Sequence, residues 1–79
     1  MLKIDGHDNA VIGTATPWIN GRWTEVLVYD GQAIVKNLVV RDDMTLDEAR
    51  EYIQFNIEGA YVGDETPIIV WKCDLDELE

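Results

Sequence analysis

The side chains that most often carry out chemistry in proteins are scarce in this sequence. It holds one histidine, His7, and one cysteine, Cys73, and it contains no serine. A serine triad is therefore excluded, and a cysteine–histidine pair would need two residues from opposite ends of the chain to meet. We therefore expect no catalytic residues and no enzymatic activity.

Metal and cofactor sites are equally poorly supported by the residue types. Zinc sites use about four nitrogen or sulfur ligands, usually in closely spaced pairs, and the sequence has no such pairs. The stretches DGHDN and DLDELE lack the Asp-x-Asp-x-Asp-Gly pattern of a calcium loop. VIGTA has too few glycines for a phosphate-binding loop. We expect no metal and no cofactor.

Carboxylates are the one chemical group present in excess. Sixteen acidic residues against six basic ones give a net charge of −10. The charge is uneven: residues 1–39 carry −1 and residues 40–79 carry −9. One interpretation is that the charge only keeps the protein soluble, since net charge governs colloidal behaviour and choice of partner rather than fold. The other is an acidic face for a basic partner.

The acidic half suggests which residues would contact such a partner. Lysine and arginine in a nucleic-acid channel attract carboxylates as well as phosphates at long range. Direct nucleic-acid binding is disfavoured, because it needs clustered basic residues. The adjacent acids 42 and 43 are better explained by capping of a following helix than by catalysis. The candidate partner-binding acids are Asp42, Asp43, Asp47, Glu48, Glu51, Glu58, Asp64 and Glu65.

In size, charge and the expected order of strands and helix, the chain resembles the small acidic inhibitors that phages make against bacterial defence, anti-CRISPR proteins in particular. The resemblance covers the whole chain as a profile and includes no motif, so it assigns no residue. It implies an inhibitor that blocks a basic nucleic-acid-binding surface, with a CRISPR effector complex or another nucleic-acid-binding protein as partner. It also implies a location in the host cytoplasm.

Strand-like segments dominate the first half of the sequence. Residues 10–16, 22–30 and 32–40 are rich in β-branched and aromatic side chains. Asn20-Gly21 and Asp30-Gly31 separate them, and both pairs are typical of two-residue type I′ turns. The first turn would pair Ile19 with Arg22, Trp18 with Trp23, Ala15 with Val26, Thr14 with Leu27 and Ile12 with Tyr29. The second would pair Tyr29 with Gln32, Leu27 with Ile34, Val26 with Val35, Glu25 with Lys36 and Trp23 with Leu38.

A helix is predicted over residues 46–58. Thr45 and Glu48 have the spacing of a capping box, and Gly59 is a natural helix end. The expected buried stripe consists of Leu46, Ala49, Ile53, Ile57 and Ala60. A fourth strand follows at residues 68–73, parallel to the third strand. The prediction is a two-layer α+β fold, β-β-β-α-β, with an antiparallel meander, one helix on one face, and the last strand beside strand one or strand three.

Both faces of the predicted sheet are apolar, and one helix covers one face. We place the helix over the face of small residues, which consists of Val11, Ala15, Val26, Val28, Ala33 and Val35. The aromatic face would then be uncovered, and Trp18 and Trp23 would serve as interface anchors. The function would in that case be a homodimeric or adaptor module that binds protein through this face. Alternatively, the helix covers the aromatic face and the tryptophans close the core.

A chain of 79 residues is expected to form one domain, here residues 1–73, followed by an acidic tail at residues 74–79. The apolar runs are too short to cross a bilayer, and MLKIDGHDNA lacks the features of a signal peptide. A lone cysteine suits a reducing compartment. We expect a cytoplasmic protein that does not bind membranes.

Overall fold

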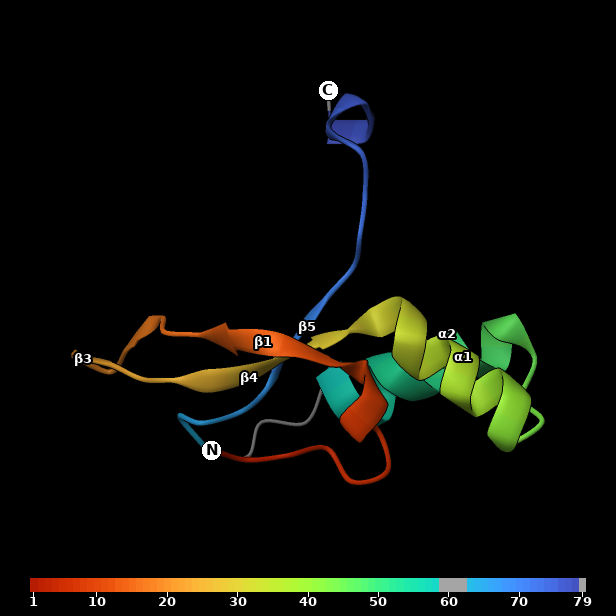
Figure 1. Ribbon diagram of the computed structural model, residues 1–79, viewed down its shortest axis with the longest axis horizontal. Coiled ribbons are helices and arrows are strands. Elements are labelled where there is room, and N and C mark those ends of the chain that lie inside the picture. The colour runs from red at the N-terminus through yellow and green to blue at the C-terminus, as the bar shows by residue number, and fades with distance from the viewer. Residues whose placement is uncertain (59–62, 79) are drawn as a thin grey trace.

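The computed structural model describes residues 1–58 and 63–78, and its fold is α+β, as the sequence predicts (Figure 1). A three-stranded sheet has the order β1-β4-β5, with β4 antiparallel to β1 and parallel to β5. Two helices, α1 and α2, connect β4 to β5. The strands and α-helices are β1 (Val11–Ala15), β2 (Trp18–Ile19), β3 (Arg22–Trp23), β4 (Val26–Asp30), α1 (Gly31–Arg41), α2 (Leu46–Ile53) and β5 (Ile68–Val70).

The predicted third strand, residues 32–40, is wrong: this segment lies within α1. Asp30 does not form a turn with Gly31 but caps the helix, and its carboxylate accepts a hydrogen bond from the backbone N–H of Gln32 at 3.0 Å. The buried residues 31, 34, 35 and 38 have helical spacing. The β-branched residues had suggested a strand, but burial of this helical stripe outweighs their weak local preference.

Loss of the third strand changes the sheet. None of the pairings predicted across Asp30-Gly31 forms, including Glu25 with Lys36. The last strand lies beside β4, not beside strand one or the segment taken as strand three, and Tyr29 is opposite Ile69. Since β4 is followed directly by helices, the chain forms a β-α-α-β connection, and parallel pairing of the two strands is its usual outcome.

The first hairpin agrees closely with the sequence. Trp18 faces Trp23 and Ile19 faces Arg22 in the two-stranded ribbon. Ala15 faces Val26 and Thr14 faces Leu27 in the main sheet. The predicted pairing of Ile12 with Tyr29 is wrong, because a bulge between residues 11 and 13 places Val11 opposite Tyr29.

The turn at Asn20-Gly21 allows a direct test. Both residues have positive φ, 49° and 83°. Replacing Gly21 by Val should lower the free energy of unfolding by about 1–2 kcal/mol, because a β-branched residue resists this conformation. A Cβ at Gly21 would touch nothing within 4 Å, so any loss comes from the backbone. Chemical denaturation measures it, and Asn20→Gly, which keeps the turn accessible, should change the midpoint little. Equal effects of both variants would contradict this explanation.

The start of the predicted helix is confirmed. The Thr45 hydroxyl accepts from the backbone N–H of Glu48 at 3.1 Å, and the Glu48 carboxylate accepts from the N–H of Thr45 at 3.0 Å. The helix continues after Ile53 as a π-helical turn, Gln54–Glu58. Of the expected stripe, Ala49 and Ile53 are buried, whereas Leu46 is exposed. Gly59 and Ala60 lie outside the described residues.

The predicted position of the helix is wrong as well. The helices pack on the face that carries Leu27 and Tyr29, and Val11, which had been assigned to the face of small residues, also packs against this core. The reason lies in α1, which supplies large core side chains that had been assigned to the sheet. The buried core cluster consists of Ala10, Tyr29, Ile34, Val35, Leu38, Ala49 and Ile53.

Candidate functional site

The tryptophan hairpin, residues 18–23, lies at one end of the molecule, and the helices lie at the other (Figure 1). The α1 helix begins at the end of β4 without a loop and runs away from the hairpin. None of the helices in the described part of the chain therefore covers Trp18 or Trp23, and these residues are 59% and 70% exposed. Their rings meet edge to face, with centroids 5.2 Å apart and an interplanar angle of 75°. This aromatic pair stabilises the ribbon while leaving much of both rings in solvent.

Five of the predicted partner-binding acids gather at the opposite end of the molecule. We call this group the acidic end; it consists of Asp42, Asp43, Asp47, Glu48 and Glu51, all exposed. Asp42 and Asp43 lie in the link between α1 and α2, and the other three lie on α2. The one ion pair among these described residues joins Arg41 Nε to Asp42 Oδ1 at 3.8 Å. The acidic end therefore presents carboxylates that are largely uncompensated.

Two members of the acidic end also have structural roles. Glu48 closes the capping box, and its hydrogen bonds with the backbone and side chain of Thr45 lower the pKa of the Glu48 carboxyl group. Asp43 has a φ of +56°, a conformation that Asp and Asn tolerate better than most residues. Asp42, Asp47 and Glu51 remain as the acids that can be changed with the least effect on the fold.

The other three predicted acids lie apart from the acidic end and are engaged within the protein. Glu58 accepts a hydrogen bond from Trp71 Nε1 at 2.8 Å. Asp64 accepts one from the side chain of Asn20 at 2.7 Å and so holds the hairpin turn. Glu65 lies 3.5 Å from the amino terminus of Met1. These contacts connect separate segments, so the structure divides the predicted acidic row into two groups.

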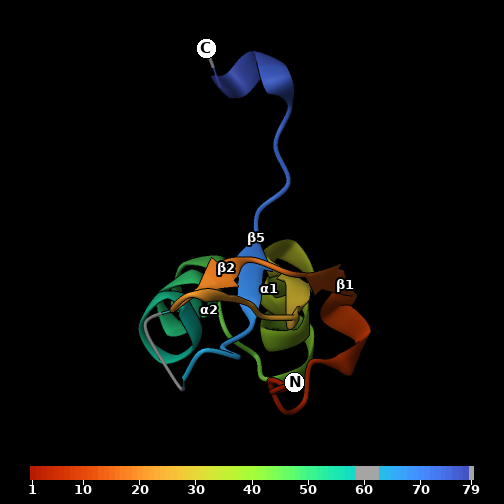
Figure 2. The same cartoon turned by 90° about the vertical axis from the view of Figure 1, so that its left-hand side faces the viewer.

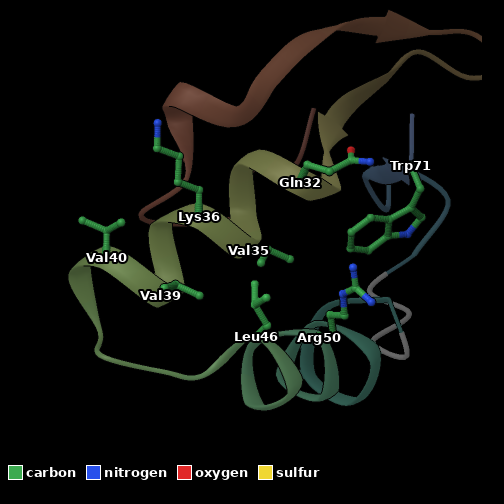
Figure 3. A pocket seen from close by; sticks show the side chains of 8 residues that line it. All are labelled: Gln32, Val35, Lys36, Val39, Val40, Leu46, Arg50 and Trp71. Carbon is green, nitrogen blue, oxygen red and sulfur yellow. The ribbon is translucent and has the colours of Figure 1, made fainter. Parts of the chain in front are cut away.

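A groove between α1 and α2 was missed by the sequence analysis (Figure 3). It has a volume of about 360 Å³ and is closed at one end by Trp71. We call it the α1–α2 groove; its lining residues are Gln32, Val35, Lys36, Val39, Val40, Leu46, Arg50 and Trp71. The groove could not be predicted while residues 32–40 were taken as a strand, because the α1 side of the groove exists only when this segment is helical. The spacing of Gly31, Ile34, Val35 and Leu38 is the signal that could have revealed it.

His7, the one histidine, is buried in a small polar cluster. The Asn37 amide donates to His7 Nδ1 at 3.1 Å and to Asn9 Oδ1 at 2.8 Å. The amide of Asn9 donates back to Asn37 Oδ1 at 3.1 Å. Burial lowers the pKa of His7, and the nearby Arg41 adds to this effect. The arrangement holds a neutral imidazole that accepts at Nδ1, so this histidine stabilises the N-terminal segment against α1.

Acidification should therefore destabilise the protein through His7. Its pKa is lower in the folded chain than the ordinary value of 6.5, so the unfolded chain takes up the proton first as the pH falls. The stabilisation is complete above that value and is lost as the pH drops through the folded pKa. Thermal melts between about pH 7.5 and about pH 5.5 should show a falling midpoint. A His7→Gln variant should show a flatter profile, and an equally steep one would contradict the assignment.

Comparison with known proteins gives no relative from which a function could be transferred: no protein family, curated protein or solved structure matches the chain. Within residues 1–58 and 63–78, none of the helices has the length and apolar character needed to cross a membrane. Any account of function must therefore come from the surfaces described above.

Proposed function

We propose that this protein is a non-enzymatic acidic binding protein whose acidic end docks on a basic surface of a protein partner. The observation that supports this is the exposure of five carboxylates around the α1–α2 link, where one weak contact with Arg41 is the single described ion pair. Exposed carboxylates that are mostly without ion-pair partners attract a basic surface, and such attraction speeds association.

The partner class that fits this surface is a nucleic-acid-binding protein. Its lysine and arginine side chains are arranged to meet phosphates, and a rigid group of carboxylates can occupy the same positions. We propose a bacterial defence complex, such as a CRISPR effector, as the target, and inhibition by steric block as the action. The encounter would take place in the cytoplasm, where Cys73 stays reduced.

A second candidate function is supported by the exposed tryptophan hairpin. Trp is the residue most enriched at the energetic centres of protein interfaces, and two of them protrude here on a tight turn. In this alternative the hairpin docks an adaptor partner or a second copy, and the acids keep the protein soluble. The two candidates differ in their response to salt, because screening weakens contacts between exposed charges more than apolar contacts.

The test is a pull-down from a bacterial lysate at low and high salt, followed by affinity measurements with the retained protein. The acidic-end variant carries Asp42→Lys, Asp47→Lys and Glu51→Lys, which spares the Glu48 cap and the Asp43 backbone. We expect it to weaken binding at least about a hundredfold, because like charges then face each other. Added double-stranded DNA should displace the wild-type protein from its partner.

A matched control carries Asp5→Lys, Asp8→Lys and Glu25→Lys, which changes the net charge equally at exposed positions outside the acidic end. It should bind nearly as well as wild type, and equal loss in both variants would show that overall charge, not the acidic end, is responsible. A third variant carries Trp18→Ala and Trp23→Ala. If it loses binding at an unchanged melting temperature while the acidic-end variant binds normally, the acidic proposal is wrong and the hairpin is the interface.

A further inference from the structure

The α1–α2 groove combines exposed apolar side chains with two basic ones. Leu46 is 60% exposed and Val40 71%, although both are apolar. Lys36 on α1 and Arg50 on α2 also line the groove; in Figure 3 the Arg50 side chain points towards Trp71, and the Lys36 side chain points from α1 away from α2. Neither side chain forms an ion pair with any of the residues that the structure describes. The chemistry that fits such a groove is an apolar side chain with carboxylates on both sides.

The chain itself contains a segment of that chemistry. We call residues 73–78 the acidic segment; its sequence is CDLDEL. Leu75 is 83% exposed, and Asp74 and Asp76 flank it. The segment runs away from the body of the fold and ends in a short 3-10 turn, Leu75–Leu78, in both Figure 1 and Figure 2. Leu75 therefore lies largely in solvent there.

From this complementarity we infer that the acidic segment of one copy docks in the α1–α2 groove of a second copy, and that the exchange is reciprocal. Leu75 would lie on the apolar floor near Leu46 and Val39. Asp74 and Asp76 would face Lys36 and Arg50, which supply opposite charge at the edges of the groove. A twofold dimer of this kind covers the exposed apolar groups of both copies with one type of contact.

The direction in which the segment leaves the fold favours a second copy over the segment's own groove. The side chain of Gln32 donates to the carbonyl of Lys72 at 3.2 Å and accepts from its N–H at 3.3 Å. This pair of hydrogen bonds fixes the chain at Lys72, beside the Trp71 end of the groove. Folding back would require a sharp reversal within Lys72-Cys73-Asp74, in which Asp74 is the one residue of a type common in turns.

The length of the acidic segment is also compatible with the length of the α1–α2 groove. If the 3-10 turn unwinds on docking, the six residues span about 20 Å at about 3.3 Å per residue. The part of α1 that lines the groove, from Gln32 to Val40, spans about 12 Å at 1.5 Å per helical residue. The segment can therefore cross to a neighbouring copy and still reach along its groove. This inference does not depend on the proposed basic partner.

Sedimentation equilibrium over a series of protein concentrations tests whether the acidic segment mediates a dimer. The wild-type chain should form a dimer, and three variants should each raise its dissociation constant at least about tenfold. The first is Leu75→Ser, the second combines Lys36→Glu with Arg50→Glu, and the third combines Asp74→Lys with Asp76→Lys. All five positions are exposed, so at low protein concentration, where self-association contributes little, the melting temperature of each variant should stay near that of wild type.

Combining the second and third variants restores opposite charges across the contact and should bring the dissociation constant back towards that of wild type. The control pair Trp18→Ala and Trp23→Ala should dimerise normally. A wild-type chain that stays monomeric up to about 1 mM would overturn the inference. The inference would also be wrong if the three variants left the dimer intact, or if only the tryptophan control lost it. It would likewise be wrong if the combined variant did not regain the affinity of the wild-type dimer.

Discussion

Replacing Ile53 by Ala is expected to lower the free energy of unfolding by about 2–5 kcal/mol. Ile53 is fully buried in the cluster that joins α2 to α1 and the sheet. Its truncation removes apolar contacts and leaves a cavity that the surrounding helices can fill only in part. For a protein of this size such a loss is a large share of the total stability. Chemical denaturation with a two-state fit measures the effect.

Leu46 provides the matched control. It lies on the same helix and on the same predicted apolar stripe, but its side chain is 60% exposed. Leu46→Ala should therefore change the stability by less than about 1 kcal/mol, since little buried surface is lost and alanine is a good helix former. The comparison should be made at low protein concentration, where self-association contributes little. Comparable losses at the two positions would mean that α2 is rotated relative to the structure described here.

Replacing Gly31 by Ala is expected to cost about 1–3 kcal/mol, which is unusual for a glycine in the first turn of a helix. Glycine normally destabilises a helix relative to alanine, so this substitution would ordinarily be neutral or favourable. Here a Cβ would lie 2.6 Å from Cε3 and Cζ3 of the Trp71 ring. The ring is held from its other side by the hydrogen bond from Nε1 to Glu58. Either this bond breaks or the helix shifts.

A double-mutant cycle isolates this cause. In a Trp71→Ala background the obstructing ring is absent, so Gly31→Ala should cost nothing or stabilise the protein slightly. The coupling between the two substitutions should therefore be about 1–3 kcal/mol by chemical denaturation. If Gly31→Ala costs the same in both backgrounds, the close packing of Trp71 on Gly31 is not the reason for the glycine.

Strong local signals in the sequence were sufficient to predict several structural features. Asn-Gly favours positive φ at two successive residues, and a two-residue turn leaves one register, so the pairing of Trp18 with Trp23 followed directly. The capping box at Thr45 follows from hydrogen bonds between residues three apart. Composition and net charge do not depend on the fold, so the excess of acidic residues was evident from the sequence alone.

The α1 helix was decided by tertiary structure. Asp30-Gly31 suits a hairpin turn and a helix start equally well, and the β-branched residues after it favour a strand locally. Packing resolves the choice, because in a helix Ile34 and Leu38 join Tyr29 and Ile53 in one core. Propensities differ by only tenths of a kcal/mol per residue, whereas burial of one large apolar side chain contributes about 1.5–3 kcal/mol.

The candidate surfaces also combine features that the sequence predicts with features that only the packing decides. That acids and tryptophans are numerous was evident from the sequence, but their positions depend on how the elements pack. Because α1 continues from β4 instead of returning over the hairpin, the tryptophans and the acidic end lie at opposite ends of the molecule. The α1–α2 groove arises only when two helices and Trp71 come together. A turn or a cap depends on neighbours in the chain, whereas a groove depends on contacts between distant residues, which local patterns do not specify.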